Sequence, residues 1–139
     1  MLEWNLISER IIKARYNSAF AKLSVIVCYA PTEDTADQEK GTFYDELQAT
    51  VDETSSPDVL RIMGDLNAKV ETDNQGKAST MGRQGIGDAN NNGDITFCQE
   101  NRLVIGGTIL KHKNIHKVTW CSPDGRTQSQ IDHVIINNR

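Results

Sequence analysis

The sequence contains no run of apolar residues that approaches the ~18 needed for a membrane-spanning helix, and its N-terminal apolar cluster is interrupted by Glu3 and Asn5. We therefore expect no secretory signal and predict an intracellular protein, nuclear or cytoplasmic, that does not associate with membranes. Only three cysteines are present, and they are widely spaced in apolar surroundings: Cys28, Cys98 and Cys121. This odd, dispersed set argues against a disulfide or zinc framework and predicts reduced thiols in the core.

Length and charge set the class of protein. With 139 residues, 37% of them hydrophobic and 24% charged, the chain is long enough for one folded domain, residues 1–139, and too short for two. The net charge is −4, yet nine acids and one base lie between residues 33 and 58, whereas six bases and two acids lie between residues 102 and 139. The basic third could face a phosphate backbone, or it could be an ordinary solvated surface.

One stretch, residues 59–68, combines a buried strand with polar residues suited to chemistry. Its apolar run stops at Gly64, and open α/β sheets place their ligands outside the carboxyl ends of their strands. Asp65 could orient or deprotonate a water molecule, and Asn67 could donate to a phosphate oxygen, which suits hydrolysis of a phosphoryl ester. The alternative is that both residues only cap a turn.

The first half of the chain predicts a β-hairpin followed by a helix. Residues 8–16 and 20–29 alternate in polarity as strands do, and residues 17–19 form the turn between them. The second strand stops at Tyr29, because a proline that follows two residues later cannot continue a ladder. Residues 35–54 place apolar side chains every four residues, as an amphipathic helix does. Together with the strand that comes next, these elements predict a layered α/β architecture.

The second half predicts a long loop and several short elements. Residues 69–92 lack periodicity, residues 93–101 are typical of a helix capped by an Asn/Gly/Asp cluster, and residues 103–107 and 118–122 are typical of strands. The cluster before the helix copies most of an EF-hand calcium loop. Its twelfth position is Gln99 instead of glutamate, so we expect a helix cap and no calcium site.

The last predicted strand, residues 129–136, carries an acid inside an apolar run. Asp132 follows Ile131 and is separated by one residue from a Val-Ile-Ile triplet. Burying a carboxylate in such a run is costly unless it is paired or functional. A basic connection earlier in the chain contains His112 and His116 at a spacing that a helix could use for zinc. No acid or cysteine lies near them in the sequence, which favours a plain loop.

Four short motifs occur in one order along the chain. They are Tyr29-Ala-Pro, Gly64-Asp65-Leu-Asn67, Val118-Thr119-Trp120-Cys-Ser122 and Gln130-Ile131-Asp132-His133. Over residues 2–139 this series resembles the endonuclease/exonuclease/phosphatase superfamily, whose fold is that of DNase I. Within it the chain most resembles the apurinic-type endonuclease domain of the reverse transcriptase-associated proteins of RTE-type non-LTR retrotransposons and of craniofacial development protein 2-like proteins.

The resemblance implies a four-layer α/β sandwich, in which two sheets pack face to face between helices, and Mg²⁺-dependent hydrolysis of DNA phosphodiesters. It implies that Asp65 orients the attacking water, that Asn67 helps to hold the water or the phosphate, and that Tyr29 contacts the scissile phosphate. Asp132 matches the family's acid that positions the catalytic histidine. Contacts with the substrate strand are implied for residues in the third motif and the turn after it: Thr119, Trp120, Ser122 and Arg126.

Two parts of the family's active site have no counterpart in the sequence. The family's Asn and Glu metal ligands come from an N-terminal half, and its catalytic histidine comes from a final Ser-Asp-His motif, neither of which the sequence contains. His133 does not replace that histidine, because Ile-Asp-His-Val belongs to an earlier strand of the family. We therefore expect a partial domain that lacks its N-terminal half and last strand, with unknown metal ligands.

The first hypothesis is a fragment of a Mg²⁺-dependent DNA endonuclease of retrotransposon type, a hydrolase that is inactive or weak alone. The second is a non-catalytic module for nucleic-acid or protein interaction, derived from such a domain. A phosphatase of the same fold is the third. The expected partner is DNA, and a homodimer through exposed sheet edges is a further expectation, because unpaired strand edges seek partners.

Overall fold

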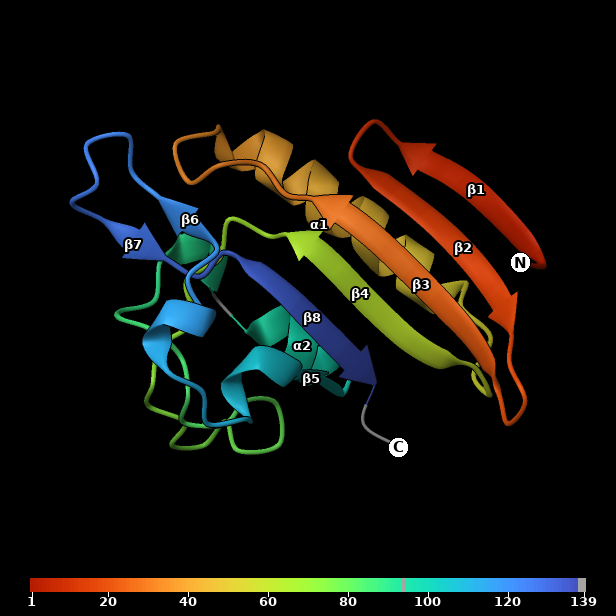
Figure 1. The fold of residues 1–139 in the computed structure, drawn as a ribbon. Coiled ribbons are helices and arrows are strands. Elements are labelled where there is room, and N and C mark those ends of the chain that lie inside the picture. The colour runs from red at the N-terminus through yellow and green to blue at the C-terminus, as the bar shows by residue number, and fades with distance from the viewer. Residues whose placement is uncertain (94, 138–139) are drawn as a thin grey trace.

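A six-stranded sheet organises residues 1–93 and 95–137, which are the residues that the computed structural model describes (Figure 1). Its strands, in spatial order, are β1 (Glu3–Ser8), β2 (Ile11–Asn17), β3 (Lys22–Tyr29), β4 (Val59–Asp65), β8 (Asp132–Asn137) and β5 (Leu103–Ile105). The β3–β4 pair is parallel, and the other neighbouring pairs are antiparallel. A separate ribbon of β6 (Trp120–Cys121) and β7 (Gln128–Ser129) lies at the end of the sheet where β3 and β4 finish.

One face of the sheet is covered by α1 (Asp37–Asp52), the helix that connects the parallel strands β3 and β4 (Figure 1). Its apolar residues recur every four positions, so Phe43 and Leu47 lie on one stripe and are buried. They belong to the same core as alternate residues of the two strands, of which Ile26 and Ile62 have no exposed surface. The crossover brings the carboxyl ends of β3 and β4 to one edge of the sheet.

Short elements complete the chain after β4. They are η1 (Asn91–Gly93), α2 (Thr96–Glu100), η2 (Gly106–Thr108) and η3 (Asn114–His116), where η denotes a 3-10 helical turn. The long segment between β4 and η1 forms a loop, as predicted, with an isolated bridge between Met81 and Ile105. Within residues 1–93 and 95–137, no helix is long and apolar enough to cross a membrane.

Most of the sheet agrees with the sequence predictions, but several elements differ. The hairpin of β2 and β3, the helix α1 and the strands β4 and β5 lie where they were expected. Strand β1 was not predicted, because nearly all of its side chains are exposed and it has no buried side to alternate with a polar one. The helix expected over residues 93–101 is wrong in length, since α2 has five residues and Ile95 at its N-cap supplies no side-chain hydrogen bond. Asp94, expected at its start, lies outside the described residues.

The strand predicted over residues 129–136 is correct from Asp132 onward and wrong before it, because the chain forms two strands in two different sheets there. β7 ends before Ile131 and β8 begins at Asp132. The backbone N–H groups of these two residues both donate to the hydroxyl oxygen of Thr119, at 3.1 and 3.2 Å. This side chain takes the place of a ladder partner and lets the chain pass from one sheet to the other. The strand expected over residues 118–122 is likewise reduced to the two residues of β6.

Two of the three cysteines are buried. Cys28 and Cys98 lie in the core, and burial raises the pKa of each thiol to about 12. Cys121 is exposed, so the prediction of core thiols is wrong for this residue. Cys121 lies on the β6–β7 ribbon, outside the six-stranded sheet. The alternation of polar and apolar residues in the sequence does not show whether one face of such a strand is packed against a core or both faces are exposed.

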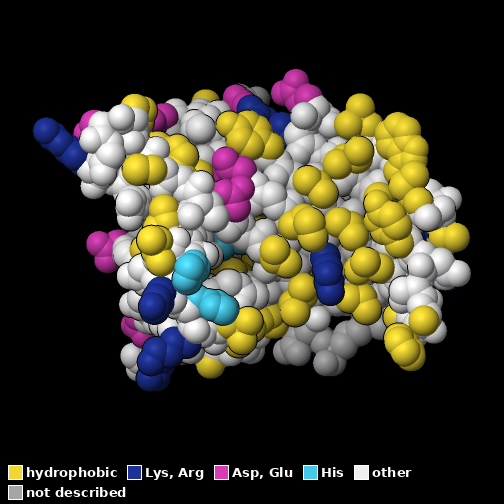
Figure 2. Space-filling model, in the orientation of Figure 1, with side chains coloured by type: hydrophobic (Ala, Val, Ile, Leu, Met, Phe, Trp, Pro, Cys, Tyr) yellow, Lys and Arg dark blue, Asp and Glu magenta, His cyan; other side chains and the backbone are white. Residues whose placement is uncertain are grey.

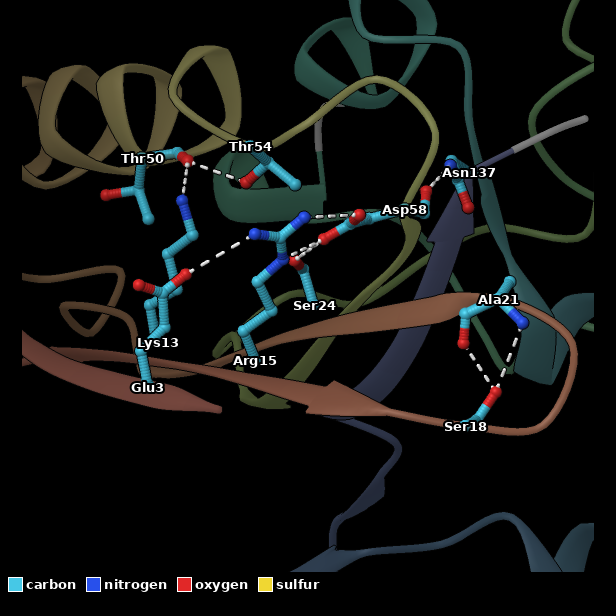
Figure 3. Close-up of polar contacts among 10 residues, drawn as sticks. All are labelled: Glu3, Lys13, Arg15, Ser18, Ala21, Ser24, Thr50, Thr54, Asp58 and Asn137. Carbon is cyan, nitrogen blue, oxygen red and sulfur yellow. Dashed lines mark hydrogen bonds and ion pairs between the residues drawn. The ribbon is translucent and has the colours of Figure 1, made fainter. Parts of the chain in front are cut away.

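A polar cluster joins β2, β3 and the start of β4 (Figure 3). Asp58 is 1% exposed and accepts hydrogen bonds from the Arg15 guanidinium at 2.6 and 2.9 Å and from the Ser24 hydroxyl at 2.8 Å. The bond from Arg15 is the main reason that the pKa of Asp58 is lowered, and it also raises the pKa of Arg15. Asn137, at the end of β8, donates to the Asp58 carbonyl oxygen at 3.2 Å. The cluster therefore fixes four strands relative to one another.

The face of the sheet opposite α1, called the front face below, presents side chains in rows that run across the strands. The middle row is entirely apolar and consists, in strand order, of Leu6, Ile12, Val27, Met63 and Val134. The next row contains one arginine and consists of Trp4, Ala14, Val25, Arg61 and Ile136. Leu6 is 69% exposed and Trp4 is 58% exposed. Figure 2 shows this broad field of hydrophobic side chains, with a basic side chain inside it and acidic side chains beside it.

Candidate active site

Three polar side chains form a further row at the rim of the front face, where β3 and β4 end. Tyr29 of β3 pairs with Asp65 of β4, and Asp65 pairs with Asp132 at the start of β8. Directly paired residues lie on the same face of a sheet with their side chains next to each other. This acidic row, as we call it, follows the apolar middle row on the same face. The structure thus brings together two residues that the sequence placed at strand ends, Tyr29 and Asp65, and one that it placed inside a strand, Asp132.

Gly64 allows Asp65 to reach this row. It has a φ of +136°, and a Cβ atom at this position would lie 2.0 Å from the carbonyl oxygen of Cys28. Only glycine permits β4 to run this close to β3 in this conformation. The connection between the strands continues past the glycine, because the Ala30 N–H donates to the Asp65 carbonyl oxygen at 2.8 Å. The glycine of the Gly-Asp-x-Asn motif is therefore required by the strand that carries the acid.

Asn67 holds the loop after β4 against the end of β3. Its φ is +47°, a left-handed conformation that asparagine tolerates better than most residues. Its backbone N–H donates to Asp65 Oδ1 at 2.9 Å, and its side-chain Nδ2 donates to the Ala30 carbonyl oxygen at 2.8 Å. Asn67 is therefore hydrogen-bonded to Asp65, one of the two acids of the acidic row. The turn that was the alternative reading of the motif exists, and it fixes the Asp65 carboxylate at the same time.

The acidic row places the carboxylates of Asp65 and Asp132 next to each other. Burial is the first cause that raises the pKa of Asp65, and the charge of Asp132 raises it further, while the Asn67 N–H and His133 act in the opposite direction. Neither acid forms an ion pair with a Lys or Arg side chain among the residues that the structure describes. Two adjacent carboxylates of this kind attract a cation.

The acidic row offers two carboxylate ligands to a divalent metal. Magnesium is commonly held by one or two carboxylates, with water molecules and substrate phosphates completing its coordination, so Asp65 and Asp132 fit this ion as a partial site. No group of three or more His, Cys, Asp or Glu side chains converges to hold a metal in the described part of the chain. This donor set suits an ion that is shared with a phosphate more than a closed structural metal site.

His133 lies on the opposite side of the sheet from Asp132. It is 5% exposed, and its Nε2 is 2.7 Å from the Ala68 carbonyl oxygen, which assigns the proton to this nitrogen. Its Nδ1 is buried and has no hydrogen-bond partner among the described residues. Burial is the main cause that lowers the pKa of His133. The histidine therefore supports the loop after Asn67 from inside the core and does not reach the acidic row.

The residues expected to contact the substrate divide into two pairs. Thr119 is engaged in the turn into β8, and the Ser122 hydroxyl accepts the Thr127 N–H at 2.9 Å, so both stabilise the ribbon. Trp120 is 42% exposed on β6, and Arg126 is exposed in the turn between β6 and β7. The β6–β7 ribbon, which carries this exposed second pair, lies at the end of the sheet that carries the acidic row (Figure 1).

Two residues near the acidic row were not predicted from the sequence. The Arg10 guanidinium carbon lies 5.6 Å from the centroid of the Tyr29 ring, and Arg10 also pairs with Glu39 of α1 at 2.8 Å. Asn90, from the long loop, donates to the Asn67 carbonyl oxygen at 2.9 Å and accepts the Lys69 N–H at 2.8 Å. Only the position of Arg10 in the first strand of the predicted hairpin, opposite the end of the second strand at Tyr29, could have indicated its proximity to the site.

Comparisons with known proteins bear on the fold. No protein-family model matches the sequence. Craniofacial development protein 2 of Bos taurus is 41% identical to this chain and that of Tragulus javanicus is 40% identical, each over 137 residues. The match covers 97% of this chain but 23% and 24% of the relatives, so the chain spans about a quarter of their length.

Solved structures with the same fold include two proteins of low sequence identity. The endonuclease domain of TRAS1, a telomere-specific non-LTR retrotransposon, superposes with a TM-score of 0.62 at 15% identity, over 93% of this chain and 51% of that one. An endonuclease/exonuclease/phosphatase family protein from Leptotrichia buccalis C-1013-b gives 0.53 at 14% identity, over 92% and 42%. The chain therefore has the DNase I-like α/β fold and resembles the endonuclease/exonuclease/phosphatase proteins.

Proposed function

We propose that the chain is part of a Mg²⁺-dependent DNA endonuclease of retrotransposon type and that it is inactive or weak alone. The observation that carries this proposal is the acidic row, in which Tyr29, Asp65 and Asp132 stand side by side where the parallel strands end. The DNase I-like fold and the likeness to the TRAS1 endonuclease domain support it.

Each residue of the proposed site has a separate task. Asp65 orients the attacking water. Tyr29 is 52% exposed, so its hydroxyl is accessible to the scissile phosphate. Asn67 holds the Asp65 carboxylate through its backbone N–H and lies beside the incoming water or phosphate. Mg²⁺ held by Asp65 and Asp132 would neutralise charge on the phosphate oxygens.

Low activity of the isolated chain follows from the same geometry. The acidic row supplies two carboxylates, and His133, the nearest imidazole in sequence, is buried on the other side of the sheet. His133 is therefore not placed to protonate a leaving group beside Asp132. Catalytic groups that act as a unit are not additive, and an incomplete set loses orders of magnitude in rate.

The shape of the site favours DNA over a small phosphoester. The acidic row lies on an open rim, and Trp120 and Arg126 are exposed on the ribbon at the same end of the molecule. An enzyme for small ligands usually encloses them in a concave pocket. An open rim, with an exposed aromatic ring and an exposed guanidinium on the ribbon at the same end of the sheet, instead suits a polymer whose bases stack and whose phosphates bind cations.

The experiment is fluorescence anisotropy of a labelled DNA duplex, titrated with the chain with and without Mg²⁺. We expect Mg²⁺ to strengthen binding of the wild-type chain, and we expect this strengthening to be lost in the Asp65→Asn and Asp132→Asn variants. Asp73→Asn, which removes an exposed acid from the long loop, is the matched control and should respond to Mg²⁺ as the wild type does. Equal affinity with and without Mg²⁺ would refute the proposed metal-dependent site.

Plasmid nicking tests the second half of the proposal. With Mg²⁺, the chain is expected to nick supercoiled DNA no faster than its Asp65→Ala variant. Clear nicking that Asp65→Ala abolishes would show that the isolated chain possesses a complete site. Metal-enhanced DNA binding without nicking would match the proposal, whereas DNA binding that ignores both Mg²⁺ and Asp65 would favour a non-catalytic interaction module.

A further inference from the structure

Tyr29 is an exposed member of the acidic row with few restraints on its side chain. It is 52% exposed, and its hydroxyl forms no hydrogen bond with another residue in the described part of the chain. A free tyrosine side chain can adopt several rotamers, and each rotamer places the hydroxyl at a different point. A tyrosine that contacts one phosphate of a substrate therefore needs a neighbour that holds its ring, because productive geometry depends on orientation.

Arg10 is the neighbour that contacts this ring. Its guanidinium carbon lies 5.6 Å from the centroid of the Tyr29 ring, within the ~6 Å range of a cation–π interaction. The backbone brings the two residues together, because the Tyr29 N–H donates to the Arg10 carbonyl oxygen at 3.0 Å. This hydrogen bond follows directly after the last β2–β3 pair, Ile11 with Cys28. Arg10 therefore lies beside the acidic row, next to its tyrosine.

Glu39 holds the guanidinium in this place. Arg10 Nη2 donates to Glu39 Oε1 at 2.8 Å, and the Arg10 side chain is only 25% exposed. Glu39 belongs to the first turn of α1, the helix that follows β3. An arginine side chain has several rotatable bonds, so without this carboxylate it would be free to leave the ring. The contact between Arg10 and Tyr29 thus depends on a third residue from another element.

The charges around Arg10 argue against a direct contact between its guanidinium and DNA. A hollow between the β1–β2 turn and α1 is lined by the acids Glu9, Glu39 and Glu46, and Arg10 is the only base among the described residues that line it. A phosphate that approached the guanidinium from this side would be repelled by three carboxylates. The influence of Arg10 on a phosphate is therefore exerted through Tyr29.

We propose that Arg10 is a positioning residue for Tyr29 and that Glu39 positions Arg10 in turn. The inference rests on the proposed function, in which the Tyr29 hydroxyl contacts the scissile phosphate. The guanidinium holds the ring so that the hydroxyl stays at the rim beside Asp65, where the phosphate and Mg²⁺ meet. The β1–β2 turn, the end of β3 and the first turn of α1 then determine together where a single hydroxyl lies.

The first test observes the ring without DNA or metal, so its outcome is independent of the proposed function. The chain has three tyrosines, and Tyr29→Phe identifies the Tyr29 ring signals in a ¹³C NMR spectrum. Arg10→Met and Glu39→Gln are each expected to shift the Tyr29 signals and to leave those of the other two tyrosines in place. Arg10→Lys, which keeps a cation near the ring, should retain part of the wild-type shift. Tyr29 signals that do not respond to Arg10→Met overturn the proposal.

The second test measures binding of a labelled DNA duplex by fluorescence anisotropy in the presence of Mg²⁺. Tyr29→Phe is expected to weaken binding about tenfold, and Arg10→Met about threefold. Glu39→Gln should weaken binding about twofold, although it removes a negative charge that repels DNA. Glu53→Gln, at the other end of α1, is the matched control and should not weaken binding. Stronger binding of Glu39→Gln would show simple charge repulsion and overturn the proposal.

A double-mutant cycle decides whether Arg10 acts through Tyr29. In the Tyr29→Phe background, Arg10→Met should weaken binding no more than Lys22→Met, which removes the same charge at the start of β3, at the opposite end of the strand. A full Arg10→Met loss in that background would show a direct DNA contact and overturn the proposal. The thermal transition of each variant checks its folding. A wild-type chain that does not bind DNA refutes the proposed function, and the NMR signals then still decide whether Arg10 holds the ring.

Discussion

Replacement of Gly64 by alanine is expected to destabilise the protein severely, although it adds one methyl group. The new Cβ would lie 2.0 Å from the Cys28 carbonyl oxygen, and the φ of +136° is one that alanine rarely adopts. Backbone strain of this type costs about 1–3 kcal/mol, and relief of the clash requires β3 and β4 to separate where their parallel ladder is continuous. A total of at least ~3 kcal/mol is therefore expected, a large part of the ~5–15 kcal/mol of a typical domain.

The matched control is Gly41→Ala. Gly41 lies inside α1, where a Cβ atom would meet nothing within 4 Å. Alanine is the better helix former by about 0.8–1.0 kcal/mol, so this variant should be more stable than the wild type. The same chemical change is therefore predicted to act in opposite directions at two positions, for reasons that are visible in the backbone.

The assay is thermal unfolding followed by circular dichroism, at one fixed protein concentration. For 139 residues the unfolding entropy near 60 °C is roughly 0.29 kcal/mol/K, so ~3 kcal/mol lowers the Tm by about 10 °C and ~0.8 kcal/mol raises it by about 3 °C. A Gly64→Ala variant whose Tm falls by less than ~3 °C would refute the close approach of β3 and β4. It would also remove the reason given for the glycine before Asp65.

Three further predictions concern titration and accessibility. The pKa of Asp58 is lowered in the folded protein, so the ionised carboxylate stabilises the fold above the unfolded pKa of 3.8, and this stabilisation is lost as the pH falls below that value. In urea titrations, the difference in unfolding free energy between wild type and Asp58→Asn should therefore shrink below pH ~4. The pKa of His133 is lowered in the folded protein, so the unfolded chain takes up a proton first, and the free energy of unfolding should decrease as the pH falls below 6.5. The His133→Gln variant can still donate to the Ala68 carbonyl oxygen but does not titrate, so its stability should not show this decrease. A thiol reagent at pH 8 should modify Cys121 quickly and the two buried cysteines only on unfolding, and fast reaction of all three would contradict the core.

The elements that the sequence predicted are those with a strong periodic pattern. The helix α1 and the strand β4 have apolar residues that repeat at one period and face one core, so their position followed from the sequence. The edge strand β1 has no buried side, and the division between β7 and β8 depends on two hydrogen bonds to Thr119. A side chain from another part of the chain makes that division, and no local pattern contains this information.

The same distinction applies to the candidate site. Tyr29, Asp65 and Asp132 could be proposed because each interrupts an apolar run, and residues at strand ends converge at the edge of a sheet. The roles of Arg10 and Asn90 arise only when the turn between β1 and β2 and the long loop are folded against this edge. Whether the acidic row hydrolyses DNA remains a prediction, which the anisotropy and nicking experiments test.

The position of β8 has a consequence for how the protein acquires its fold during synthesis. Among the described strands β8 is synthesised last, yet it lies between β4 and β5 and pairs with both. Until residue 137 emerges, β4 has one unpaired edge and β5 lacks its strand partner. Until β8 is synthesised, the edges of β4 and β5 that it will pair with are therefore unoccupied, and during this time they can pair with a neighbouring polypeptide.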